Sequence, residues 1–94
     1  MNARETADRH AAFVTAGNPQ AAGADFTPDA LQQFMQLGVR PPRGANKYEV
    51  ANEAEENDQY SCDITYSNDT ESQTLRSTWS KVGDDWKIVG IAKG

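Results

Sequence analysis

Hydrophobic side chains recur every three or four positions through the first part of the chain, which is the spacing of one face of a helix. This spacing predicts a first helix over residues 2–16, with Asn2 as its N-cap and Glu5 three residues later, the arrangement of a capping box. A glycine, an asparagine and a proline at positions 17–19 are then expected to end the helix. Glycine and asparagine accept a left-handed backbone, and proline cannot continue a helix.

A second helix is predicted to begin at Thr27, because a threonine cap is followed there by a proline and then by an acidic residue. Gly38 is placed to end it. Its buried face is expected to consist of four apolar side chains: Leu31, Phe34, Met35 and Leu37. Between the two helices, residues 20–26 contain three alanines that would allow one helical turn (Ala21, Ala22 and Ala24), but Gly23 and Asp25 favour a loop.

From residue 46 the apolar positions alternate with polar ones, which is the period of a half-buried strand. Four strands are predicted, over residues 48–54, 59–66, 72–82 and 86–92. Short polar turns separate them, so the strands should pair as an antiparallel meander. The helices precede the sheet, which makes the fold class α+β. We expect one domain over residues 1–94, with a helical layer (2–38) packed on a four-stranded antiparallel β-meander (46–93).

The last predicted strand differs from the other three because both of its faces carry apolar side chains. Trp86, Ile88 and Gly90 point one way, whereas Val89 and Ile91 point the other. One interpretation is a second burial event, in which Trp86, Val89 and Ile91 contact a protein partner or a second copy of the chain in a homodimer. The other is a curled sheet that the N-terminal segment covers on both sides. The sequence leaves both open.

Composition narrows the possible partners. The chain has 94 residues and a net charge of -5, so nucleic acid is a poor default partner because it selects a cationic surface. No stretch approaches the length of a membrane span, so no membrane insertion is expected. The N-terminus lacks the apolar core of a signal peptide. The location is therefore left unknown: cytoplasmic as the chain stands, extracytoplasmic if a leader was removed.

The candidate chemistry is sparse. His10 is the single histidine and is interpreted as a structural or surface residue. Cys62 is the single cysteine, which excludes an intramolecular disulfide. Core packing is the favoured interpretation of Cys62, and a reactive or pairing thiol is the alternative. Asp63 and Arg76 are expected to form a surface ion pair. An acidic run lacks the spacing and central glycine of a calcium loop, so it predicts a solvated turn: Glu53, Glu55, Glu56 and Asp58. No catalytic residue, metal site or cofactor is predicted.

Aromatic residues give the one set of candidate ligand contacts. Three tyrosines share the inward parity of their strands, and a tryptophan lies on the inward face of the third: Tyr48, Tyr60, Tyr66 and Trp79. An aromatic ring with a polar tip suits a pocket wall and also suits the edge of a core. Core packing is the simpler interpretation, and a pocket lined by these four residues is the alternative.

The strand region resembles a known family. Its segments 48–50, 60–66, 74–79 and above all 82–89, with Gly83, Asp84 and Asp85 before Trp86, Lys87 and Ile88, resemble the C-terminal meander of the NTF2-like, cystatin-like superfamily. The nearest members are small bacterial domains described as lumazine-binding-like or as lipoproteins with a domain of unknown function. The resemblance implies a curved sheet around helices and a pocket between them, but it fixes no activity. The chain is shorter than the catalytic members and lacks a recognisable acid–base pair.

The sequence therefore favours a non-catalytic binding or accessory domain that acts through protein contact or self-association. Two alternatives stand beside it. One is a small-molecule-binding enzyme of the NTF2-like type, similar to an isomerase or a dehydratase. The other is an extracytoplasmic lipoprotein domain whose leader was trimmed.

Overall fold

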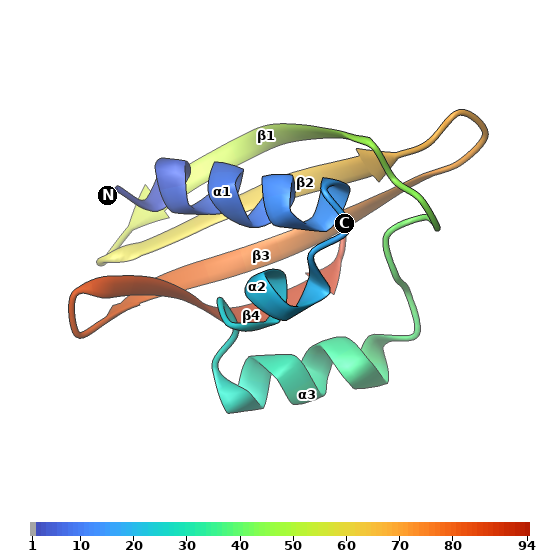
Figure 1. Cartoon of the computed structure of the whole chain (residues 1–94). Helices are drawn as coiled ribbons and strands as arrows, with labels where there is room; N and C mark the ends of the chain where they lie inside the picture. Colours follow the sequence, from blue (N-terminus) through green and yellow to red (C-terminus); the bar gives the residue numbers. More distant parts are fainter. Residues whose placement is uncertain (1) are drawn as a thin grey trace.

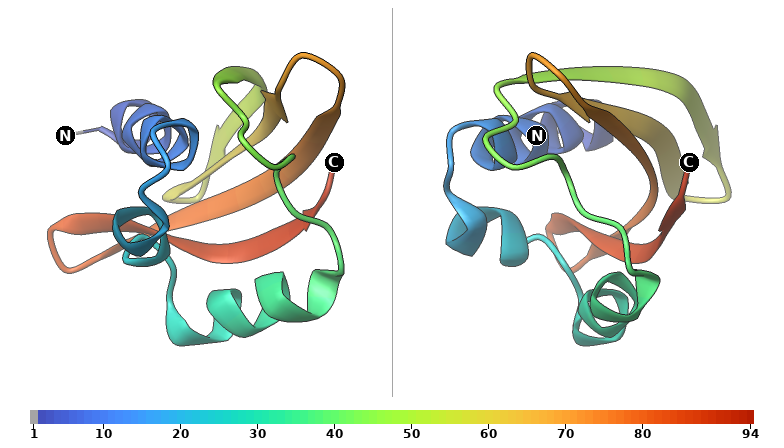
Figure 2. Two further views of the ribbon diagram at one scale, coloured as in Figure 1. Left: turned by 45° about the vertical axis from the view of Figure 1, so that its right-hand side comes forward. Right: turned by 90° about the vertical axis from the view of Figure 1, so that its right-hand side faces the viewer.

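The computed structural model describes residues 2–94 and has three helices packed on a four-stranded antiparallel sheet (Figure 1). The helices are α1 (Ala3–Thr15), α2 (Pro19–Gly23) and α3 (Pro28–Leu37). The strands are β1 (Lys47–Glu56), β2 (Gln59–Ser67), β3 (Ser72–Val82) and β4 (Asp85–Lys93), in the spatial order β1-β2-β3-β4. The predicted α+β class and the antiparallel meander are confirmed. In Figure 2 the sheet bends around the helical layer.

The predicted helix ends are also confirmed. The Asn2 side chain accepts a hydrogen bond from the Glu5 backbone N–H at 2.8 Å, and the Glu5 carboxylate accepts from the Asn2 N–H at 2.9 Å. Thr27 caps α3 in the same way by accepting from the N–H of Ala30. At the other end of α3, Gly38 adopts a left-handed backbone with φ of 78°. Residues other than glycine rarely adopt this conformation.

The loop predicted over residues 20–26 is wrong, because Pro19–Gly23 forms the short helix α2. The Asn18 side chain accepts a hydrogen bond from the Ala21 N–H at 3.3 Å, and Pro19 occupies the first helical position. This is the same cap-then-proline signal that marks the start of α3. Burial of Ala22 then stabilises a helix that is too short to form alone.

The inner face of the sheet carries the side chains that the alternation predicted. Seven residues of β2 and β3 are 4% exposed or less on this face: Tyr60, Cys62, Ile64, Tyr66, Leu75, Ser77 and Trp79. Antiparallel pairing places Tyr60 opposite Trp79 and Tyr66 opposite Gln73. The outer face of the same strands is polar, with Asp63 opposite Arg76.

The expectation that Ile91 points away from Ile88 is wrong, because β4 contains a bulge. Trp79 pairs with Ile88 and the preceding Thr78 pairs with Gly90, so two residues on β3 lie opposite three on β4, and Ser77 then pairs with Ile91. The extra residue returns Ile91 to the face that Ile88 occupies. Ile91 therefore packs against the core. The two-faced apolar pattern that suggested an interface arises from this bulge around Val89.

The buried stripe predicted for α3 is only partly correct. Phe34 and Leu37 pack against the core, but Leu31 is 39% exposed and Met35 is 64% exposed. The reason is the position of α3, which runs beside β4 at the edge of the sheet (Figure 1). A helix at an edge meets protein along a narrower stripe than one lying flat on a sheet.

The helical layer also supplies hydrogen bonds to the free edge of β4. The Ile88 N–H donates to the Asp25 carbonyl at 2.7 Å, and the Thr27 N–H donates to the Ile88 carbonyl at 3.0 Å. Further along, the Ile91 N–H donates to the Gln33 side chain at 3.3 Å. These bonds satisfy an edge that would otherwise be open to pairing with another chain.

Candidate functional site

A cavity of about 640 Å³ lies between the helices and the inner face of the sheet. All three helices contribute to its wall, together with the segment 40–46 and strands β2, β3 and β4. Most of the wall is apolar, and its larger members include Val14, Phe26, Phe34, Ile64, Leu75, Ile88 and Ile91. The volume lies within the range of roughly 300–1,000 Å³ that small-molecule pockets occupy.

The sequence of α1 explains why this space stays open. The helix meets the sheet through Ala3, Ala7 and Ala11, which are each 4% exposed or less. These small side chains bring the helix backbone close to the strands but reach no further. Because α3 lies at the sheet edge, no large side chain from the helical layer fills the remaining volume.

His10 is one of the buried polar residues of the cavity wall. Its Nδ1 lies 3.1 Å from Oδ2 of Asp25, and the two side chains are 7% and 5% exposed. The carboxylate accepts the hydrogen bond, so Nδ1 carries the proton. Arg9 reaches the other carboxylate oxygen at 3.7 Å. His10 thus belongs to a buried pair, so of the two positions considered for it, structural or surface, the structure shows a buried one.

The second ring nitrogen of His10 belongs to a side chain that is part of the cavity wall. Residues 2–94 offer no hydrogen bond to this atom, Nε2. In the same part of the chain, every side-chain nitrogen or oxygen that is sealed from solvent has a partner. Nε2 is therefore not sealed, and His10 is part of the cavity wall. The ring is held edge-on to Phe26 and Trp79, with centroids 5.7 and 5.6 Å away.

Two buried hydroxyl groups, of Ser77 and Tyr66, are also part of the wall. Ser77 accepts a hydrogen bond from Nε1 of Trp79 at 2.9 Å, which occupies its oxygen. Tyr66 is also part of the wall, and none of the described residues forms a hydrogen bond with its hydroxyl. Burial raises the pKa of the Tyr66 phenol well above its ordinary value, with smaller contributions from Cys62 and Tyr48. The phenol is thus a neutral hydrogen-bond donor at physiological pH.

One basic side chain of the described residues, Arg40, lies in the wall of the cavity. Its guanidinium stacks 4.4 Å from the centroid of Phe34 and donates hydrogen bonds to the carbonyls of Phe34 and Val39. Arg40 therefore closes the C-terminal end of α3 and places a positive charge beside the cavity. No acidic side chain is part of the wall as described.

Of the four aromatic residues predicted to line a pocket, the structure places Tyr66 in the wall of this cavity and the other three outside it. Trp79 is fully buried behind the His10 ring. Tyr48 pairs with Tyr66 but lies on the edge strand β1, where it is 36% exposed.

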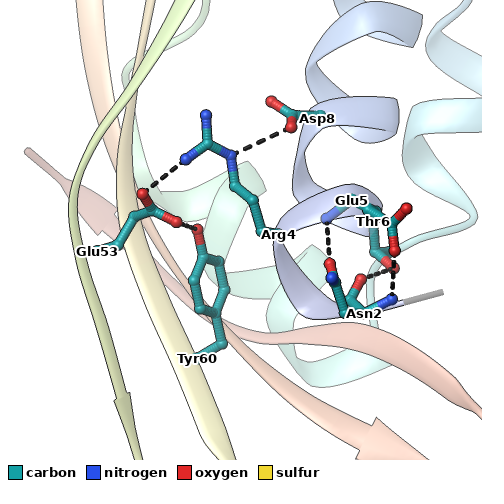
Figure 3. Close-up of polar contacts among 7 residues, drawn as sticks. All are labelled: Asn2, Arg4, Glu5, Thr6, Asp8, Glu53 and Tyr60. Atoms are coloured by element: carbon teal, nitrogen blue, oxygen red, sulfur yellow. Dashed lines mark hydrogen bonds and ion pairs between the residues drawn. The ribbon is translucent and has the colours of Figure 1, made fainter.

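Tyr60 belongs instead to a polar cluster that joins α1 to β1 (Figure 3). Its hydroxyl donates to Glu53 at 2.7 Å, and Arg4 bridges Glu53 at 2.6 Å and Asp8 at 3.1 Å. The hydrogen bonds from Tyr60 and Arg4 hold the pKa of the Glu53 carboxyl below its usual value. This cluster anchors the helix and borders no described part of the cavity.

The outer face of the sheet carries the predicted ion pair between Asp63 and Arg76, at 3.1 Å. Asn52 donates a further hydrogen bond to Asp63 at 2.8 Å, and Arg76 also bonds the hydroxyl of Ser61. The Asn52 hydrogen bond, followed by Arg76, lowers the pKa of the Asp63 carboxyl. The network lies opposite the cavity and links three strands.

The remaining predicted residues take structural positions. Cys62 is fully buried, as expected for core packing, and burial raises the pKa of its thiol. Trp86 packs against the core, and Val89 is half-buried at the bulge. Residues 2–94 contain no cluster of three or more potential metal ligands. Over the same range the helices are too short and too polar to cross a bilayer.

The pair that sequence reasoning missed is His10 with Asp25. The two residues are 15 positions apart, with the end of α1 and all of α2 between them. No periodicity connects them, because their contact depends on how α2 folds back. Asp25 belongs to no recognisable motif and is, in the sequence, only an acidic residue at the end of an alanine-rich segment.

Comparisons with known proteins give no assignment: no family model matches the chain, and neither curated proteins nor solved structures yield a match.

Proposed function

We propose that this protein binds a small, largely apolar molecule in the cavity between its helices and its sheet. The observation that carries the proposal is the cavity itself, about 640 Å³ of space in a chain of 94 residues. The wall of this space is mostly apolar. A ligand that fills the space removes apolar surface from water, which favours binding.

The polar groups of the wall define the shape of the ligand. His10 lies beside Trp79, whereas Tyr66 pairs with Gln73, six positions earlier on the same strand. A molecule that contacts both ends of the wall has an apolar body and polar groups that hydrogen-bond these side chains.

The layered arrangement also supports the resemblance to the NTF2-like superfamily, which we propose on the same footing. Of the functions considered from the sequence, small-molecule binding has the most support from the structure, because the cavity offers space for a ligand. A protein contact through Trp86, Val89 and Ile91 was suggested by apolar side chains on both faces of the last strand. Ile91 points into the molecule, so this support for a protein contact is weaker. Light scattering over a range of concentrations tests self-association independently.

A pair of variants on α3 tests the binding function. Leu31 is part of the cavity wall, whereas Met35, one turn further along the same helix, is not, and both are exposed. We expect the neutral dye Nile red to bind the native protein with increased fluorescence. Leu31→Trp should narrow the cavity and weaken binding by about tenfold or more, equivalent to about 1.4 kcal/mol. Met35→Trp should bind as the native chain does.

Unfolding curves of both variants establish that each is folded under the conditions of the titration. Equal affinity of the native chain and Leu31→Trp would place the dye elsewhere on the surface. Absence of any saturable binding by the native protein would refute the proposed function.

A further inference from the structure

We infer that the open edge of β1 pairs with the same edge of a second copy of the chain, which joins two sheets about a two-fold axis. The two edges of the sheet differ in what covers them. At β4, hydrogen bonds with Asp25, Thr27 and Gln33 satisfy the edge. At β1, the border strand on the other side, residues 2–94 provide no pairing partner except β2 (Figure 1). Unpaired backbone groups along a strand edge are a template for a further strand.

The part of this edge that can accept a strand is short. Strand β1 keeps an unbroken register with β2 from Lys47 to Ala51, and the register then shifts where Asn52 adopts a left-handed backbone with φ of 53°. A bulge bends a strand and increases its twist, so the acidic residues among 53–56 lie outside the pairing segment. Side chains at 47–49 are exposed and those at 50 and 51 are half-buried, which leaves the segment accessible.

The charges on this segment decide which residue lies on the two-fold axis. Opposite residues of an antiparallel pair point to the same face, so the axis must pass through a residue and not between two. With Lys47 or Glu49 on the axis, two like charges lie opposite each other, which is unfavourable. With Val50 on the axis, the bulge at Asn52 would have to pair with Tyr48 of the second copy. With Tyr48 on the axis, Lys47 of each copy lies opposite Glu49 of the other.

This register gives two opposite-charge pairs and one aromatic pair in each dimer, and both kinds of cross-strand pair are favourable. Within the chain, Lys47 lies opposite Ser67 and Glu49 lies opposite Thr65, which are neutral. Residues 2–94 form no ion pair with either charge. The lysine and the glutamate are therefore available to a second copy, and the self-complementary patch is of the kind that closes a two-fold dimer.

Sedimentation equilibrium of native and charge-reversed chains tests the pairing. A contact of one short strand is at the small end of interface sizes, so we expect a dissociation constant of roughly 100 μM for the native chain. Lys47→Glu and Glu49→Lys should each weaken the dimer by about tenfold or more, because each places like charges opposite one another. Glu49→Lys also reduces the negative charge of the chain, so general repulsion between copies would predict the opposite change.

Two combinations restore the opposite charges. The double variant that exchanges Lys47 and Glu49 should dimerise as the native chain does. An equimolar mixture of the two single variants should also associate, although neither does so well alone. Lys81→Glu is the matched control: this lysine is exposed on β3, which is paired on both sides, so its reversal should leave the dimer unchanged.

A disulfide measurement tests the axis itself. Opposite residues of an antiparallel pair have Cα atoms about 4.5–5.5 Å apart, which a disulfide can bridge. Tyr48→Cys should therefore form a linked dimer under mild oxidation. Val50 lies two residues further on the same face, and the two-fold axis separates its copies by roughly 13 Å along the strands. Val50→Cys should link at least tenfold more slowly, and the buried native Cys62 is common to both variants.

Circular dichroism establishes that each variant is folded before association is measured. A native chain that remains monomeric at roughly 1 mM would overturn the inference. Dimers that persist unchanged in both single charge reversals would also overturn it, because another surface would then hold the copies together. Equal rates of linking at positions 48 and 50 would exclude an axis at Tyr48. None of these outcomes affects the proposed ligand binding, which depends on a different part of the molecule.

Discussion

The bulge in β4 can be tested by placing the same polar residue at two positions, the extra residue of the bulge (Val89) and the residue that the bulge turns inward (Ile91). Val89 and Ile91 are both half-buried, and regular alternation would put them on the same face of the strand. The structure instead places Ile91 opposite Ser77 on the inner face, with Val89 as the extra residue of the bulge. Val89→Asn and Ile91→Asn carry the same loss of strand propensity, so any difference between them reports the environment of each side chain.

The expected difference follows from what each side chain contacts. Ile91 packs against the core and is part of the cavity wall. Full burial of an isoleucine contributes about 1.5–3 kcal/mol, and a buried amide without partners adds a penalty of about 1–3 kcal/mol. Both terms are smaller for a half-buried side chain, so we expect Ile91→Asn to reduce the free energy of unfolding by about 2–3 kcal/mol. Val89→Asn is expected to reduce the free energy of unfolding by about 1 kcal/mol or less.

Urea unfolding followed by circular dichroism measures both values. For a domain of this size the larger loss corresponds to a fall in melting temperature of roughly 8–24 °C. Ile91→Asn should also weaken Nile red binding, whereas Val89→Asn should not. Equal destabilisation by the two variants, or a greater effect at Val89, would mean that the strand alternates regularly and that the bulge is wrong.

Three further outcomes follow from single side chains. The lowered pKa of Asp63 stabilises the fold above the ordinary pKa of an aspartate, and this contribution is lost as the pH falls. Asp63→Asn should therefore show a flatter decline of unfolding free energy below about pH 5, with an effect of about 1 kcal/mol or less at neutral pH because the pair is partly exposed. The fully buried thiol of Cys62 should react with a disulfide reagent only at the rate of unfolding, so immediate reaction in the native state would contradict its position. Arg40→Met should weaken binding of the anionic dye anilinonaphthalene sulfonate about fivefold or more while leaving neutral Nile red unchanged. Equal loss for both dyes would show that Arg40 acts by holding the end of α3.

The elements that could be predicted from sequence are those encoded by neighbouring residues. Strand alternation, the capping box at Asn2 and the left-handed end at Gly38 depend on residues a few positions apart, and all three are confirmed. The same local logic should have predicted α2, because Asn18 and Pro19 form the cap and first turn that Thr27 and its proline form for α3.

The features that escaped prediction depend on contacts between distant segments. The bulge that turns Ile91 inward is visible only in the pairing of β4 with β3, although the glycine at position 90 is a residue type common at such sites. The position of α3 at the sheet edge, which leaves Met35 exposed, cannot be read from its own periodicity. The pairing of His10 with Asp25 requires the path of the chain between them.

The cavity itself follows from the unequal size of side chains along α1, and this can be tested along one helix. Ala7 is fully buried where α1 lies against the sheet, whereas Val14, two turns later, is half-buried and borders the cavity. A larger side chain at the first position has no free volume to enter, so Ala7→Leu is expected to destabilise the fold by about 1–3 kcal/mol. Val14→Phe can extend into the cavity and should change the free energy of unfolding by less than about 1 kcal/mol, while competing with Nile red for space. If Val14→Phe proved as destabilising as Ala7→Leu, the C-terminal half of α1 would be as tightly packed as its start. A binding function based on free volume would then have no physical basis.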